Sequence, residues 1–276
     1  MLRRPVLAAV AALALASACS AESSPPEDTS HAHLTLPAGD GTTSSYVGYS
    51  LVRLSLPRRA GEPGTYSFGI EAFDGTPTTE FLEEQTKRMH VYVVREDLSV
   101  FRHVHPTMAS NGTWSGRVTL PEGGRYRLVA EFTADDHGGL GDSVILGAWA
   151  HVGPPETLVQ PATETALEAQ IEITAGGELR VGPSEPSAPS LSIGVSARGE
   201  PAQLGTFLGT YAHVTGFNLK TGAVVHTHPL GAPVVEGDQT MLEFYTEFRE
   251  PGHYELFVQV RVSGVLRTVP VTVHVA

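Results

Sequence analysis

Cysteine is almost absent from this chain of 276 residues, because Cys19 is the only one. A single cysteine excludes an internal disulfide. Positive charge is also scarce: lysine occurs only at Lys87 and Lys220, and the formal net charge is −12. So acidic a chain lacks the positive surface that holds nucleic acid through its phosphates, and it is repelled by anionic lipid. We therefore expect no nucleic-acid partner and no membrane contact through a basic patch.

Long hydrophobic runs are missing except at the N-terminus, where an apolar run of about 12 residues follows Arg3 and Arg4. This run is too short for a membrane span and is typical of a secretory signal. The segment "ALASAC" before and including Cys19 resembles a bacterial lipobox, in which the cysteine becomes the acylated N-terminus. The alternative is ordinary cleavage after Ala18 that leaves an idle thiol.

We predict a lipoprotein signal peptide over residues 1–18, lipid attachment at Cys19 and a flexible tether over 19–32. Removal of 1–18 takes away two arginines and no acid, which leaves a net charge of −14. The mature protein is then exported, and the lipid anchors it to the outer face of the cytoplasmic membrane.

Helical periodicity is nearly absent from the rest of the chain. Short runs such as "YSLVRLSL" (49–56), "TYSFGIEAF" (65–73) and "LEAQIEI" (167–173) alternate apolar and polar residues between turns rich in Gly, Pro and Asp. This pattern predicts an all-β fold with two tandem immunoglobulin-like β-sandwich domains. We expect the first sandwich at 33–152, a linker at 153–164 and the second sandwich at 165–276, with a helical turn only at 78–88.

Histidines occur in one pattern that is written twice. The stretches "FRHVHP" (101–106) and "VVHTHP" (224–229) both end in His-x-His-Pro, and each follows a lone histidine. The lone His90 precedes His103 by 13 residues, and His213 precedes His226 by the same 13. Together with "EGGRYRLVAEF" (122–132) and "EPGHYELFVQV" (250–260), this spacing indicates a duplicated domain.

These strings resemble those of a largely uncharacterised family of exported bacterial proteins, often lipoproteins, with tandem immunoglobulin-like domains. In that family an "LGxxxH" segment and an "HxHP" hairpin recur, as in "LGTYAH" (208–213) and "HTHP" (226–229) here. The resemblance covers roughly residues 48–276. It implies the same fold and export, and it implies little about activity.

The duplicated histidines are candidate metal ligands. In a hairpin, residues i and i+2 lie on one face about 6–7 Å apart, and opposed Cβ atoms lie about 4.5–5.5 Å apart. Three imidazoles so placed can converge on one ion at about 2.0–2.1 Å. We expect ligands at His90, His103, His105, His213, His226 and His228; Met108, His151 and His274 could add further ones. Structural histidines that brace a hairpin are the alternative.

The sequence thus favours a membrane-anchored, extracytoplasmic lipoprotein that binds copper first and zinc second. A metal-handling or cell-envelope protein could be its partner. An adhesion or scaffold protein with structural histidines is the alternative, and a pH sensor is a third hypothesis. We expect no enzyme, because the sequence contains no catalytic triad, no phosphate loop and no paired carboxylates suited to acid–base work.

Overall fold

β-strands are the regular elements of the computed structural model, which describes residues 37–135, 143–154, 171–177, 179–182 and 190–276. Within those ranges there is no α-helix, and no helix long and apolar enough to cross a membrane occurs there. The predictions for the signal peptide (1–18), Cys19, the tether (19–32) and most of the linker (153–164) lie outside the described residues.

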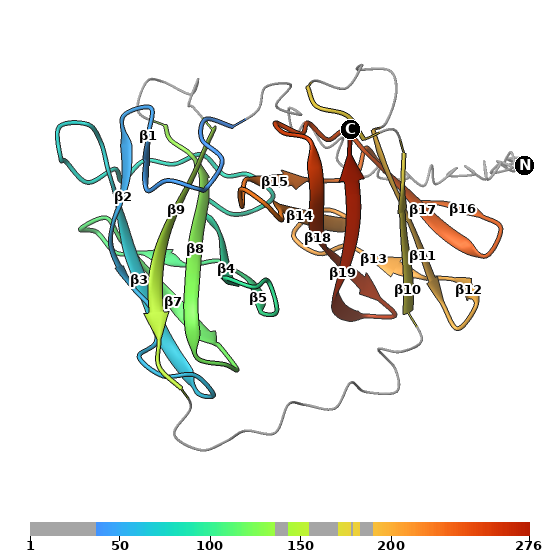
Figure 1. Ribbon diagram of the computed structural model, residues 1–276, viewed down its shortest axis with the longest axis horizontal. Helices are drawn as coiled ribbons and strands as arrows, with labels where there is room; N and C mark the ends of the chain where they lie inside the picture. Colours follow the sequence, from blue (N-terminus) through green and yellow to red (C-terminus); the bar gives the residue numbers. More distant parts are fainter. Residues whose placement is uncertain (1–36, 136–142, 155–170, 178, 183–189) are drawn as a thin grey trace, which may run out of the picture. The chain divides into compact units, whose positions relative to one another are not determined.

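The first half forms two antiparallel sheets (Figure 1). The first sheet has the order β1 (Ser45–Tyr46), β2 (Tyr49–Ser55), β3 (Pro63–Glu71), β7 (Thr113–Thr119) and β6 (Thr107–Met108). The second sheet has the order β5 (Phe101–Val104), β4 (His90–Arg95), β8 (Gly124–Thr133) and β9 (Ser143–Val152). The sheets enclose a core that includes Tyr66, Phe68, Trp114 and Leu128.

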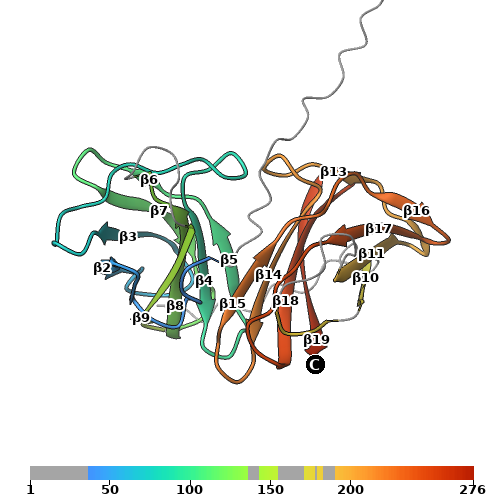
Figure 2. The same cartoon turned by 90° about the horizontal axis from the view of Figure 1, so that it is seen from above.

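The second half repeats this arrangement, and Figure 2 shows the same strands from above. One sheet runs β10 (Ile171–Gly176), β11 (Leu191–Ala197), β17 (Gln239–Phe244), β16 (Val234–Glu236), with β12 (Glu200–Pro201) paired to β11. The other runs β13 (Leu204–Gly205), β18 (Gly252–Val262), β14 (Ala212–Asn218), β15 (Val224–Thr227), with β19 (Val265–Val275) paired to β18. Ile193, Phe244 and Leu256 lie in its core.

The prediction of an all-β chain with two tandem immunoglobulin-like sandwiches is confirmed. The expected helical turn at 78–88 is wrong. That stretch is irregular and contains a tight turn closed by two backbone hydrogen bonds between Glu84 and Lys87. Gln85 and Thr86 both have positive φ in this turn, a conformation that no helix contains.

A third apolar cluster joins strands from both sandwiches. Strands β4 and β14 are buried along nearly their whole length, because successive side chains point to opposite faces and both faces are covered. Val91 and Val93 face the first core, whereas Tyr92 and Val94 belong to the third cluster. Its other members are Phe101, Val129 and Ile145 from the first sandwich, and Phe217, Val224 and Phe257 from the second.

Phe257→Ala tests how much this third cluster stabilises the fold. The ring of Phe257 stacks on that of Phe101 with centroids 4.3 Å apart and planes 4° apart. Truncation of a buried phenylalanine to alanine should lower the free energy of unfolding by about 3–5 kcal/mol. Denaturant unfolding measures this free energy.

Phe73→Ala is the control, because the side chain of Phe73 is 94% exposed. It should change the free energy of unfolding by less than about 0.5 kcal/mol. A loss below about 1 kcal/mol for Phe257→Ala would contradict the packing described.

Candidate metal centre

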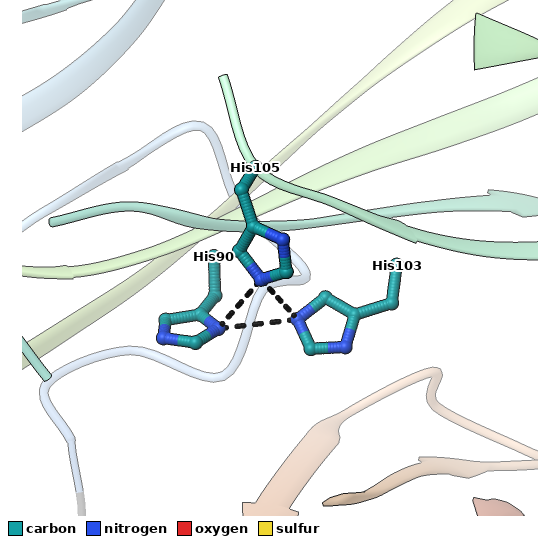
Figure 3. A group of neighbouring side chains, drawn as sticks. All are labelled: His90, His103 and His105. Carbon is teal, nitrogen blue, oxygen red and sulfur yellow. Dashed lines mark hydrogen bonds between the residues drawn. The ribbon is translucent and has the colours of Figure 1, made fainter. Parts of the chain in front are cut away.

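Three histidines of the first sandwich converge on one point (Figure 3). We call His90, His103 and His105 the first triad. The Nδ1 atom of His90 lies 3.1 Å from Nε2 of His103 and 3.3 Å from Nε2 of His105, and the two Nε2 atoms are 3.1 Å apart. One nitrogen from each ring therefore faces the same small space.

Strand register explains how these side chains meet. Tyr92, rather than His90, is paired with His103 across β4 and β5. His90 begins β4 two residues earlier, so its ring reaches His103 diagonally, on the face that Tyr92 also shares. Strand β5 ends at Val104, and Pro106 follows His105, in keeping with the extended geometry that proline favours in the preceding residue.

In two of these rings the outer nitrogen, which points away from the shared space, makes a hydrogen bond. Nε2 of His90 donates a hydrogen bond to the backbone carbonyl of Glu84 at 3.0 Å, and Nδ1 of His103 donates to Oε1 of Gln259 at 2.7 Å. In a neutral ring the inner nitrogen then carries a lone pair. The inner nitrogens of His90 and His103 thus turn two lone pairs toward each other at 3.1 Å. A cation between them would make this repulsive contact favourable.

The second triad consists of the matching histidines of the second copy, His213, His226 and His228, whose ligand atoms lie within 4.8 Å of one another. Nε2 of His213 donates to the carbonyl of Phe207 at 3.0 Å, and Nδ1 of His226 lies 2.7 Å from Oε2 of Glu131. Three of the four remaining nitrogens, Nδ1 of His213 and Nε2 of both His226 and His228, are buried without a hydrogen-bond partner. Buried polar atoms are rarely left unpaired, so these three atoms indicate a ligand.

Equivalent turns hold the two lone histidines. Glu84 and Phe207 are 123 residues apart, the same interval as between His90 and His213. Each begins a two-residue turn with positive φ, at Gln85 and Thr86 in one copy and at Leu208 and Gly209 in the other. Positive φ is uncommon for side chains such as leucine, and such strain is concentrated at functional sites.

The two triads are adjacent to each other. Ring centroids of His90 and His226 are 5.7 Å apart, and those of His103 and His213 are 5.6 Å apart. The ring centroid of Tyr92 lies 4.8 Å from that of His103 and 5.4 Å from that of His226, and its hydroxyl donates a hydrogen bond to Glu131 at 2.6 Å. Six imidazoles from four strands and two strand ends therefore form one cluster.

Burial keeps five of these six histidines neutral at physiological pH, namely His90, His103, His105, His213 and His228. It lowers the pKa of His105 and of His213 to about 3, with smaller contributions from neighbouring histidines. Burial likewise lowers the pKa of His90, and it holds the pKa values of His103 and His228 well below the usual range. A neutral imidazole is the form that binds a metal ion.

The carboxylate of Glu131 is in hydrogen-bond contact with the cluster. Burial raises its pKa, but the electrostatic interaction and hydrogen bond with His226, together with the hydrogen bond from Tyr92, outweigh that effect and leave the pKa at about 2. The group is therefore ionised and supplies negative charge beside the second triad.

The additional candidates lie elsewhere. Met108 in β6 packs against the first core. His151 is exposed in β9 opposite Arg125, and His274 in β19 is opposite His253, with ring centroids 4.8 Å apart. Neither histidine belongs to a triad. The predicted lipid attachment at Cys19 lies outside the described residues.

Sequence reasoning missed Glu131, Gln259 and Tyr92. A signal for the first two was present in the repeat, because "EGGRYRLVAEF" and "EPGHYELFVQV" place Glu131 and Gln259 at the same offset. A polar residue repeated at one position within the apolar part of a strand indicates a buried partner.

The chain belongs to a family described as a domain of unknown function, DUF8832, whose model matches residues 45–140 and 161–276. No curated protein matches the chain. Among solved structures, a tetra-tandem repeat in the extending region of a large adhesion protein is 8% identical, with a TM-score of 0.28, over 83% of this chain and 49% of that one.

Two further structures have similar scores. A DUF4785 family protein from Legionella pneumophila is 13% identical, with a TM-score of 0.28, over 81% of this chain and 57% of that one. Invasin, a bacterial integrin-binding protein, is 14% identical, with a TM-score of 0.23, over 82% of this chain and 38% of that one. The chain thus spans 38–57% of the length of these structures, and likenesses of this size carry no argument about function.

The lowered pKa values predict how the stability of the metal-free protein depends on pH. Below about pH 6.5, histidines of the unfolded chain take up protons that the folded clusters still exclude. The free energy of unfolding should therefore fall as pH decreases from 7 to 5, by up to about 1.4 kcal/mol per pH unit for each histidine involved. Denaturant unfolding with a chelator at several pH values measures the slope.

His105→Gln/His228→Gln is the matched variant, because it removes two of these imidazoles. Its stability should depend less steeply on pH over the same range. A wild-type protein whose stability is flat between pH 7 and 5 would show that the clusters do not exclude protons as described.

Proposed function

We propose that this protein binds two transition-metal ions, one in each histidine triad. The observation that carries the proposal is the pair of facing lone pairs in the first triad, with three unpartnered buried nitrogens as its counterpart in the second. In both copies the outer nitrogen of the lone histidine is held by a carbonyl, and a second ring is held by a side chain. Hairpin braces would leave no such set of inner nitrogens.

The spacing of the nitrogens fits an ion. For metal–nitrogen bonds of about 2.0–2.1 Å in tetrahedral geometry, the nitrogens should be about 3.3–3.4 Å apart. The three separations in the first triad are 3.1, 3.3 and 3.1 Å, so little movement is needed. Three ligands leave a fourth position open for an exchangeable group.

Binding affinity and the charge of the ion both favour copper as the bound metal, with zinc second. Copper binds most tightly in the divalent series, and imidazole suits both metals. Two divalent ions would bring four positive charges to a site where Glu131 supplies the hydrogen-bonded carboxylate. Cu(I) brings half of that charge, which lowers the cost of burial. We therefore include Cu(I) beside Cu(II) and Zn(II) in the test.

Holding or passing on an ion accounts for this site better than catalysis does. The donors are imidazoles, and the carboxylate beside them is engaged by Tyr92 and His226. We propose further that Cys19 is acylated and anchors the protein to the outer face of the cytoplasmic membrane, where it would meet a metal-handling or cell-envelope partner. The lipobox-like segment supports this location.

Metal titration by calorimetry tests the proposal. The chain is purified with Cys19→Ser so that no thiol competes, and it is titrated with Cu(II), Cu(I) under reductant, and Zn(II). We expect about two ions per chain. His103→Ala and His226→Ala should each weaken one site by about 100-fold or more, since loss of a ligand exceeds loss of an outer hydrogen-bond partner. The exposed His151→Ala should leave both sites unchanged.

Two results would overturn the proposal. Absence of any site tighter than about 10 μM would return the histidines to a structural role and favour the scaffold hypothesis. If the protein binds a single ion, and His103→Ala and His226→Ala each abolish its binding, the proposal of two separate sites is wrong.

A further inference from the structure

Each triad is completed by a residue of the other sandwich. Gln259 of β18 accepts a hydrogen bond from Nδ1 of His103, and Glu131 of β8 accepts one from Nδ1 of His226. Both contacts are 2.7 Å long. The two histidines occupy matching positions in the repeat, and so do their two partners. The duplication therefore relates the two contacts to each other, and each contact crosses from one sandwich to the other.

Further hydrogen bonds fix the orientation of both Gln259 and Glu131. Gln259 is buried, and its Nε2 donates to Oγ1 of Thr268 at 3.1 Å, which leaves Oε1 toward His103. Oε2 of Glu131 accepts a second hydrogen bond from the Tyr92 hydroxyl at 2.6 Å. Both acceptors thus fix the orientation of a ring that belongs to the other half of the chain.

The two contacts differ in chemistry. A carboxylate that accepts the outer N–H of a metal-binding histidine raises the basicity of the inner nitrogen and adds a compensating negative charge, and such partners alter metal affinity by about 10–100-fold. A neutral amide orients the ring without that charge. The duplication therefore contains two triads with the same histidine pattern and unequal electrostatics.

We propose that Glu131 and Gln259 are crossed positioning residues that make the second triad the tighter metal site of the two. This inference rests on the proposed metal function. The ion at His213, His226 and His228 should bind first, and the first triad should fill at higher metal concentration. Because each partner comes from the other sandwich, full affinity at either triad requires the two sandwiches to be docked.

Isolated triads test the proposal. His103→Ala/His105→Ala leaves only the second triad, and His226→Ala/His228→Ala leaves only the first. In these backgrounds Glu131→Gln should weaken Cu(II) binding to the second triad by about 10–100-fold, and Gln259→Glu should strengthen binding to the first triad by at least several-fold. Competition with a chelator of known affinity gives the constants, and the Cu(II) electron paramagnetic resonance spectrum should change with each substitution.

Glu255→Gln is the matched control. Glu255 lies on the same strand as Gln259 and accepts a hydrogen bond from Thr272, and its substitution removes the same charge as Glu131→Gln. It should leave affinity and spectrum unchanged. A gain of affinity in Gln259→Glu cannot come from damage to the fold, so this variant decides the matter even if Glu131→Gln is unstable.

The outcomes separate the two proposals. If the unsubstituted protein binds no ion, the metal function itself fails. If it binds two ions but Glu131→Gln and Gln259→Glu leave the isolated affinities within twofold of their backgrounds, the crossed positioning role is overturned and the metal function stands. If the first triad proves the tighter site in unsubstituted protein, the assigned order is wrong.

Discussion

The histidine cluster depends on one constraint. Hydrogen bonds to the outer ring nitrogens turn the lone pairs of the inner ring nitrogens toward one another. An imidazole whose outer N–H is donated to a carbonyl or carboxylate must, when neutral, present a lone pair on its other nitrogen. Glu84, Phe207, Glu131 and Gln259 impose that state on four rings. Facing acceptors repel each other, so the fold must stabilise this arrangement by its packing.

That packing comes from strands buried on both faces. Val91 and Val214 anchor β4 and β14 in their own sandwich cores, while His90 and His213 on the same strands face away from those cores. The stacked rings of Phe101 and Phe257 join the two halves beside the histidines. Burial excludes water from His103 and His228 and lowers their pKa values.

The duplication has kept the histidine pattern and the turns that hold the lone histidines, but it has changed the charge of the side-chain acceptors. Turns at 84–87 and 207–210 share their conformation although their residues differ, because the backbone carbonyl alone is needed to hold the lone histidine. The side-chain acceptors have diverged, with a carboxylate at Glu131 and an amide at Gln259. A pair of sites with unequal affinity is the expected consequence of such a change.

Much of this could be read from the linear pattern. Alternating strands predict the two sandwiches, and the spacing of His90, His103 and His105 against its copy predicts two triads, because both depend on local periodicity. The contacts of His226 with Glu131 and of His103 with Gln259 could not be predicted. They join residues 95 and 156 positions apart, and only the pairing of sheets across the chain determines which polar groups share a buried space.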